Sequence, residues 1–283
     1  MTPPAGDGGN RAGRSGLPVG DLPTTESVTI DLPVPASALA VGAHPDDIEF
    51  GCGATLAKWA AAGCRLYHLI LTDGSKGSWD PDAELATLVA ERMNEARASA
   101  SALDGASDSG SQREDRVIFL HRVDGALENG ITERRDVARI IRTIRPAALL
   151  GHDPWRRYRL HPDHRAAGFL TVDALVAARD PHFFAELELP PHRPDALLLF
   201  EADQPNHLEE ATGFESAKVE ALLCHKSQWE STMGIDGTGR SEAAEPSDSD
   251  RTRFASKVHR QLADHGSHAG RQLGEAFHLM TDL

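Results

Sequence analysis

The feature that most constrains this chain is a short apolar run that ends in three polar side chains. Residues 39–43 read Leu-Ala-Val-Gly-Ala, which is typical of a buried strand, and residues 44–47 read His-Pro-Asp-Asp. A buried strand that ends in this way places one imidazole and two carboxylates at one edge of a sheet. A second cluster, His-Pro-Asp-His at 161–164, lies more than a hundred residues further on. Two such clusters in one chain indicate a metal site or a proton-transfer site.

Strand-like and helix-like patterns alternate along the chain. Short apolar runs predict strands at 38–43, 66–71, 117–120, 147–151 and 195–200. Helical spacing of apolar residues predicts helices at 51–62, 81–103, 131–144 and 162–178. This alternation predicts the α/β class, with a single-domain, Rossmann-like, mostly parallel sheet and helices on both faces. Ligands of such sheets bind beyond the carboxyl ends of the strands, and both polar clusters follow predicted strands.

The amino-acid composition of the chain indicates where the folded domain begins and which segments are irregular. Residues 1–25 are rich in Pro, Gly, Asp and Arg without periodicity, and we expect them to form a disordered tail. We expect the domain itself to cover residues 26–283. Within it, the Gly-, Ser- and Glu-rich stretch 232–250 predicts a mobile insertion, and 251–283 predicts a helical segment.

The overall charge narrows the choice of partners. The chain has 29 basic and 43 acidic residues, which gives a net charge of -14. This balance disfavours nucleic acid and anionic lipid as partners, and no apolar run is long enough for a membrane span. The first residues lack the apolar core of a secretory signal, so we expect a cytoplasmic location. The three cysteines have no CxxC spacing, and we expect them to be reduced.

The two His/Asp clusters contain the residue types of a catalytic zinc site. Zinc favours imidazole nitrogen and carboxylate oxygen, and a catalytic zinc keeps one position for water. A tight turn could aim His44 and Asp47 at one point, with His164 arriving from the second cluster, but spacing alone leaves this division open. Each piece also has a structural interpretation as a turn, a helix cap or a pair of surface histidines. Their joint position after predicted strands favours the metal site.

Several ordered motifs resemble the LmbE-like (PIG-L) deacetylase family over residues 38–230. The motifs are Ala43-His44-Pro45-Asp46-Asp47, Gly51-Cys52-Gly53, Thr72-Asp73-Gly74, Arg92-Met93-Asn94-Glu95, His161-Pro162-Asp163-His164 and His225-Lys226-Ser227-Gln228. Members of this family are zinc enzymes that remove acetyl groups from N-acetylglucosamine units. One departure is visible: many members have Glu directly after the two aspartates, whereas here Ile48 stands before Glu49.

The resemblance implies a role for each polar residue of the two clusters. It places zinc on His44, Asp47 and His164, and the same ligands would also accept iron(II) or cobalt. It makes Asp46 the general base, and His161 the group that stabilises the oxyanion or protonates the leaving amine. It makes Asp163 the carboxylate that orients His161. A metal-bound water with a pKa of about 7, beside a free carboxylate, suits the hydrolysis of an amide.

Further residues are candidates for substrate contacts or for support of the metal. Arg92 matches a sugar-contacting arginine of the family, although an arginine on a solvated helix face is an equally good interpretation. Asp73 and Lys76 lie on the loop after the second strand, where Lys76 could meet an anionic substituent or have no such role. Asp153 could orient a metal-bound histidine or cap a turn, and His225 could line the site or pack in the interior.

These observations predict a zinc-dependent hydrolase that removes the N-acetyl group from an N-acetylglucosamine-type sugar or its conjugate. The expected partner is a small-molecule amino sugar, and the resemblance leaves room for a homo-oligomer. One alternative is an amidase that cleaves a larger acyl group from a glucosamine-inositol thiol conjugate. Another is a non-catalytic metal- or nucleotide-binding Rossmann-like protein, although the G-x-G-x-x-G turn of nucleotide sites is absent after the first strand.

Overall fold

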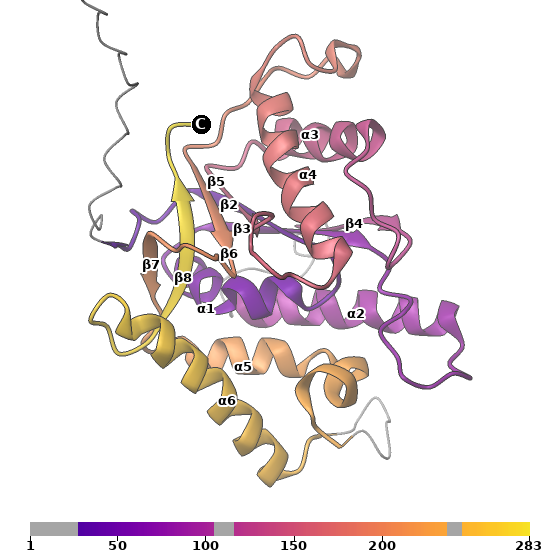
Figure 1. Ribbon diagram of the computed structural model, residues 1–283, viewed down its shortest axis with the longest axis vertical. Helices are drawn as coiled ribbons and strands as arrows, with labels where there is room; N and C mark the ends of the chain where they lie inside the picture. Colours follow the sequence, from indigo (N-terminus) through magenta and orange to yellow (C-terminus); the bar gives the residue numbers. More distant parts are fainter. Residues whose placement is uncertain (1–27, 105–115, 237–244) are drawn as a thin grey trace, which may run out of the picture.

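A single open sheet forms the centre of the fold (Figure 1). The computed structural model describes residues 28–104, 116–236 and 245–283. Within these residues the sheet has eight strands in the order β1-β7-β8-β6-β5-β2-β3-β4. The strands are β1 (Thr29–Ile30), β2 (Ser37–Gly42), β3 (Arg65–Thr72), β4 (Val117–Arg122), β5 (Ala148–His152), β6 (Ala196–Phe200), β7 (His207–Glu210) and β8 (Gly274–Met280).

The sheet is mostly parallel, as predicted. β3 pairs in parallel with β4 and β2, β2 pairs with β5, and β5 pairs with β6. β8 is inserted between β6 and β7 and runs antiparallel to both. The inner strand β5, with the sequence Ala-Leu-Leu-Gly-His, is buried along its whole length because helices cover both faces of the sheet.

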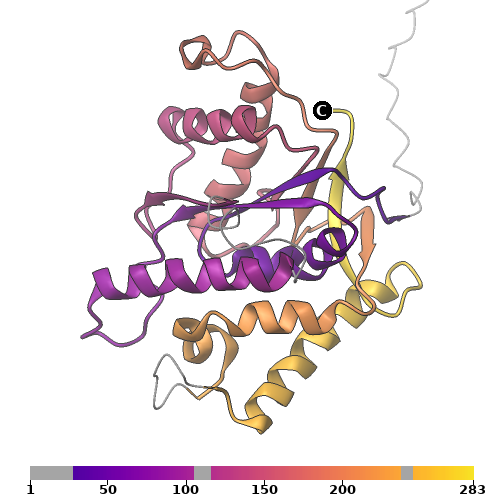
Figure 2. The ribbon, with the colours of Figure 1, turned by 180° about the vertical axis from the view of Figure 1, so that it is seen from behind.

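Two pairs of helices cover the two faces (Figures 1 and 2). α3 (Ile131–Ile144) and α4 (Pro162–Arg179) pack on one face, and α1 (Asp47–Ala61) and α2 (Leu85–Asp104) pack on the other. α3 shows why such helices form here. Its buried apolar side chains recur at helical spacing and so make a single stripe that faces the sheet.

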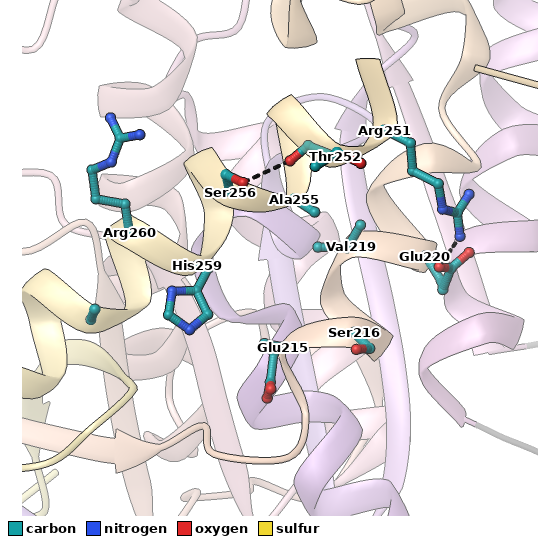
Figure 3. A pocket seen from close by; sticks show the side chains of 11 residues that line it. Glu215, Ser216, Val219, Glu220, Arg251, Thr252, Ala255, Ser256, His259 and Arg260 are labelled. Atoms are coloured by element: carbon teal, nitrogen blue, oxygen red, sulfur yellow. Dashed lines mark hydrogen bonds and ion pairs between the residues drawn. The ribbon is translucent and has the colours of Figure 1, made fainter. Parts of the chain in front are cut away.

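A third layer lies outside α1 and α2. It consists of α5 (Glu215–Leu223) and α6 (Asp248–Ser267), and it has its own apolar core that includes Leu222, Trp229 and Phe254. A groove of about 710 Å³ opens between α5 and α6, as Figure 3 shows. The described residues also form the short helices η4 (Ala185–Leu187), η5 (Lys226–Gln228) and η6 (Trp229–Met233).

The structure differs from the sequence expectations at several element ends. α1 begins at Asp47 rather than at residue 51, and α2 begins at Leu85 rather than at residue 81. The C-terminal segment that we predicted to be helical is helical only as far as Ser267 and then forms β8. Several residues of β8 are good helix formers, but pairing with β6 and β7 overrides that local preference.

Two predicted segments fall wholly or partly outside the described residues. These are the tail 1–25 and, within the predicted insertion 232–250, residues 237–244. The described flanks of the insertion belong to η6 and α6. Among the helices of the described part of the chain, none combines the length and the apolar character that a bilayer crossing requires.

Candidate metal centre

Both predicted clusters lie at the carboxyl edge of the sheet, where strands end and helices begin. β2 ends at Gly42 and leads through His44 into α1, whose first residue is Asp47. α4 begins directly after His161, so His164 lies in its first turn. β2 and β5 are neighbours in the sheet, which brings the two turns together. Segments more than a hundred residues apart in sequence therefore share one site.

The three residues predicted to bind a metal hold their ligand atoms close to one another. His44 Nδ1 is 3.3 Å from Asp47 Oδ2 and 3.3 Å from His164 Nε2. His164 Nε2 is 3.1 Å from Asp47 Oδ1. A tetrahedral ion with bonds of about 2.0–2.1 Å separates its ligand atoms by about 3.3–3.4 Å. Each Asp47 oxygen faces one of the two imidazoles, so the three side chains lie close enough to share one divalent cation. Asp47 and His164 also form such a group with His152, and His44 forms one with Asp124 and Asp163.

Two carboxylates flank the opposite side of the His44 ring. His44 Nε2 lies 3.2 Å from Asp163 Oδ2 and 3.3 Å from Asp124 Oδ1. Asp163 is itself anchored because its two oxygens accept hydrogen bonds from the main-chain N–H groups of Gly125 and Leu127. A carboxylate at one ring nitrogen fixes the tautomer that leaves the other nitrogen free for a metal. His44 can thus offer Nδ1 to a cation.

This arrangement differs from the expected role of Asp163. The sequence suggested that Asp163 orients His161, but its polar contacts in the structure are with His44 and the two main-chain groups. The physical reason is that Asp163 lies in the first turn of α4, where its buried side chain meets the loop after β4. Asp124, on that loop, was not anticipated. Its position just after a strand is a sequence signal that could have identified it.

The adjacent residues Asp46 and Asp47 have opposite electrostatic surroundings. Burial raises the pKa of Asp46 to about 6, and the Arg92 guanidinium, 3.7 Å from its carboxylate, opposes that rise. Against the effect of burial, the imidazoles of His164 and His152 hold the pKa of Asp47 well below its usual range. Asp47 is therefore suited to remain an anionic ligand. Asp46 is suited to exchange a proton near neutral pH.

His161 lies at the exposed side of the cluster. Its ring stacks on that of His164 with centroids 4.8 Å apart, and it meets the His44 ring edge-on at 4.5 Å. Burial lowers the pKa of His161, and the neighbouring His44 and His164 lower it further. In this position the neutral His161 imidazole can face a molecule in the cavity. His44 and His164 instead face Asp47.

The sequence did not single out His152, the last residue of β5. Its Nε2 atom lies 3.2 Å from Asp47 Oδ2, and its Nδ1 atom contacts Arg159 Nη1 at 3.0 Å and Glu201 Oε2 at 3.3 Å. The expected support residue was its neighbour Asp153. The two Asp153 oxygens instead accept hydrogen bonds from the main-chain N–H groups of residues 155 and 203 and shape the loop. A histidine at the end of a buried strand was the available signal.

Arg92 joins two of the loops at the site. It is 2% exposed, so its interpretation as a solvated surface arginine is wrong. Its Nη1 donates to the carbonyl of Gly74 at 2.9 Å and its Nη2 to the carbonyl of Pro45 at 2.6 Å. Asp73 shapes the same loop, because its Oδ1 accepts from the main-chain N–H groups of Ser75 and Asp124.

A cavity of about 570 Å³ opens over the cluster. Its lining includes the predicted ligands and Asp46, and also the exposed side chain of Lys76 and part of Arg92. Gln228 and residues of the third layer complete it, namely Thr232, Lys257 and Gln261. Its size lies in the usual range of small-molecule binding sites. The third layer thus contributes to the wall that a bound molecule would meet.

His225 packs in the interior rather than in the cavity wall. It is completely buried, and its Nε2 lies 3.5 Å from Glu49 Oε2. Although burial acts to lower it, the pKa of His225 is raised by Glu49. Glu49 also accepts a hydrogen bond from Ser99 Oγ at 2.8 Å. This polar cluster lies under the first turn of α1 and is one reason why that turn holds its place.

Sequence comparisons agree with the motifs. The profile of the PIG-L family, described as GlcNAc-PI de-N-acetylase, matches residues 39–175, which contain both clusters. The diacetylchitobiose deacetylase of Thermococcus kodakarensis is 32% identical over 197 residues, covering 68% of this chain and 69% of that protein. A 1D-myo-inositol 2-acetamido-2-deoxy-alpha-D-glucopyranoside deacetylase of Kineococcus radiotolerans is 30% identical over 210 residues, covering 62% of this chain and 58% of that protein.

A structural comparison gives the same result. The N,N'-diacetylchitobiose deacetylase from Pyrococcus horikoshii matches with a TM-score of 0.73 and 25% identity. The match covers 87% of this chain and 84% of that chain, and so extends well beyond the segment recognised by the family profile. The family predicted from the motifs is confirmed, and the chain belongs to the PIG-L (LmbE-like) family.

Proposed function

We propose that this protein is a zinc-dependent hydrolase that removes the N-acetyl group from an N-acetylglucosamine-type sugar or its conjugate. The observation that carries the proposal is the convergence of His44, Asp47 and His164 next to the Asp46 carboxylate, which lies against the Arg92 guanidinium. The printed names of the relatives, which are deacetylases of diacetylchitobiose and of an acetamido-glucopyranoside, support the choice of substrate class.

The residues around the cluster suit the steps of amide hydrolysis. A bound divalent metal supplies a Lewis acid that lowers the pKa of water and polarises the acetyl carbonyl. Asp46 accepts the proton of the attacking water and delivers it to the departing nitrogen. His161, at the exposed side, faces the oxygen on which negative charge develops. One water and one amide thus yield acetate and a free amine.

The metal is tested by elemental analysis of protein purified without added metal. We expect about one zinc per chain. We expect His164→Ala to lose that zinc, because two of the ligand contacts disappear with the imidazole. His182→Ala is the control, since His182 is an exposed histidine in the turn that follows α4. Iron or cobalt at the same stoichiometry would change the identity of the proposed metal. The absence of any metal would overturn the proposal.

The role of Asp46 is tested by Asp46→Asn. The amide keeps the size of the side chain but accepts no proton, so we expect full metal content and a loss of turnover of about 100-fold or more. Acetate release is measured with N-acetylglucosamine, diacetylchitobiose and an N-acetylglucosaminyl inositol. A substrate with a larger acyl group on the same nitrogen distinguishes the amidase alternative. Turnover that survives the substitution would assign the base to another residue.

A further inference from the structure

Helix α1 is interrupted just after the turn that carries the predicted site residues. Cys52 has φ -147° and ψ 20°, which is not helical, and it divides Asp47–Gly51 from the remainder of the helix. The second half is fixed in the core by Leu56 and Trp59, both almost completely buried. The first half is therefore a separate turn whose direction must be set by contacts at the break.

A buried ion pair occupies this break. In an unbroken helix the carbonyl of Phe50 would accept from the N–H of Ala54. Here Lys218 Nζ donates to the Phe50 carbonyl at 2.7 Å, and Glu275 Oε1 accepts from the Ala54 N–H at 3.1 Å. Lys218 and Glu275 bond to each other at 2.6 Å. The pair thus bridges the two backbone groups that a regular helix would join directly.

The pair satisfies the polar groups around it. Glu275 Oε2 accepts a second hydrogen bond, from the Thr55 N–H at 2.7 Å, so the carboxylate caps the resumed half of α1. Both charged side chains are 2% exposed. Burying two charges is costly unless hydrogen bonds compensate them. Here the Phe50 carbonyl accepts from Lys218, and the Ala54 and Thr55 N–H groups donate to Glu275, besides the bond between the two charges. These contacts indicate a defined geometry at the break.

The neighbouring glycines make room for the ion pair and for the strand behind it. A Cβ atom at Gly53 would come within 3.3 Å of Lys218 Cγ. A Cβ atom at Gly51 would come within 2.4 Å of the Phe200 ring. The Gly-Cys-Gly sequence thus allows a close approach on both sides of Cys52. The break is supported from α5, β6 and β8 together.

We propose that Lys218 and Glu275 are positioning residues that set the angle between the two halves of α1, and thereby hold Asp46 and Asp47 at the metal centre. The inference rests on the proposed function. Asp47 lies three residues before Phe50, whereas its partner His164 comes from α4 on the opposite face of the sheet. A small rotation at the break changes the distance between them, and shifts of about 1 Å are costly in such sites.

The chain offers a matched control in Glu209. It lies on β7 directly opposite Glu275 in the β7–β8 pairing, and its side chain is fully buried. It also binds α1, through Lys58 Nζ at 2.5 Å and Trp59 Nε1 at 3.3 Å. These contacts are at the C-terminal end of the helix, several residues beyond the break. A Glu209 variant therefore perturbs the same strand pair and the same helix without touching the ion pair at Cys52.

The experiment compares Glu275→Gln with Glu209→Gln. The measured quantities are hydrogen exchange of the backbone amides of residues 47–53, zinc affinity by competition with a chelator, and kcat and KM. For Glu275→Gln we expect faster exchange and a zinc affinity that is lower by about tenfold or more. We also expect a lower kcat with little change in KM. For Glu209→Gln we expect a lower unfolding midpoint in urea, with exchange in this segment, zinc affinity and kcat unchanged.

A purely structural role predicts a different outcome. If both variants lose similar stability and neither alters zinc affinity or exchange of residues 47–53, the inference is wrong. Lys218→Gln is the second variant, because it keeps the Glu275 cap on α1 but removes the ammonium group that donates to Phe50 and to Glu275. It is judged by the same measurements if Glu275→Gln does not fold. A wild-type protein without zinc or turnover would refute the proposed function, while the exchange comparison would still decide whether the pair positions the turn.

Discussion

Arg92 shows how one side chain can serve both the shape and the charge of the site. Its hydrogen bonds to the carbonyls of Pro45 and Gly74 connect the turn before α1 with the loop after β3. The same guanidinium lowers the pKa of Asp46, which burial alone would raise further. These two contributions are separable, because a lysine retains the positive charge but cannot donate in the same planar geometry.

This separation leads to a prediction about pH dependence. Asp46 must be ionised to act as a base, so we expect kcat/KM to increase as pH rises through about 6. Arg92→Met removes the cation, raises the pKa of Asp46, and shifts this increase to higher pH by on the order of one unit. Arg92→Lys should reduce kcat/KM while leaving the midpoint near that of the wild type. Identical midpoints in all three proteins would show that the guanidinium does not tune Asp46.

At the scale of elements, two helices approach the sheet closely at glycines, and the groups that these glycines contact differ in how easily they can move. A Cβ at Gly51 of α1 would meet the Phe200 side chain at 2.4 Å, and a side chain can change its rotamer or be shortened. A Cβ at Gly168 of α4 would meet the backbone carbonyl oxygen of His152 at 2.7 Å. That carbonyl belongs to the end of β5, which cannot yield without moving the sheet.

We therefore expect alanine to have different consequences at the two glycines. Gly51→Ala should lower the free energy of unfolding by about 1–3 kcal/mol, and the higher helix propensity of alanine should offset part of this loss. Adding Phe200→Leu to the Gly51→Ala protein should restore a further part. Gly168→Ala should cost more and reduce zinc content, because α4 carries His164. Urea denaturation and metal analysis measure these effects. A tolerated Gly168→Ala would show that α4 is not pressed against β5.

At the scale of the whole molecule, charges from several strand ends gather at one edge of the sheet. Glu201, directly after β6, pairs with His152 at the end of β5 and with Arg159 and Arg156 of the following loop. Burial acts to raise the pKa of Glu201, but His152 and Arg159 hold it at about 2. The loop that carries Arg156, Arg157 and Arg159 is thus joined to the segment after β6 by salt bridges to Glu201 and Asp203.

The sign of this shift predicts how acid affects stability. The pKa of Glu201 is lower in the folded protein than in the unfolded chain, so its stabilising contribution is complete above about 4.5 and is lost as pH falls towards 2. We expect the urea midpoint of metal-free protein to decrease over this range, and less steeply for Glu201→Gln. Glu186→Gln, which changes an exposed residue, is the control. Equal slopes for wild type and Glu201→Gln would contradict the prediction.

The local sequence determined the parallel core of the sheet and the two polar turns. Buried strands such as β2 and β5 read as uninterrupted apolar runs, and the residues that follow such strands must lie at the carboxyl edge. Clusters 44–47 and 161–164 could be placed at one edge for that reason, although their residues are far apart in the chain. The family could be recognised for the same reason, since its motifs occupy these turns.

Only the tertiary structure decided which side chains support that edge and how. His152 contacts Asp47 because β2 and β5 are neighbours, and Asp163 contacts His44 because α4 begins beside the loop after β4. β8 became a strand because an antiparallel place lay open between β6 and β7, and Glu275 on that strand reaches the break in α1. Local sequence specifies which conformations are favourable, whereas contacts between distant segments exist only after the chain has packed.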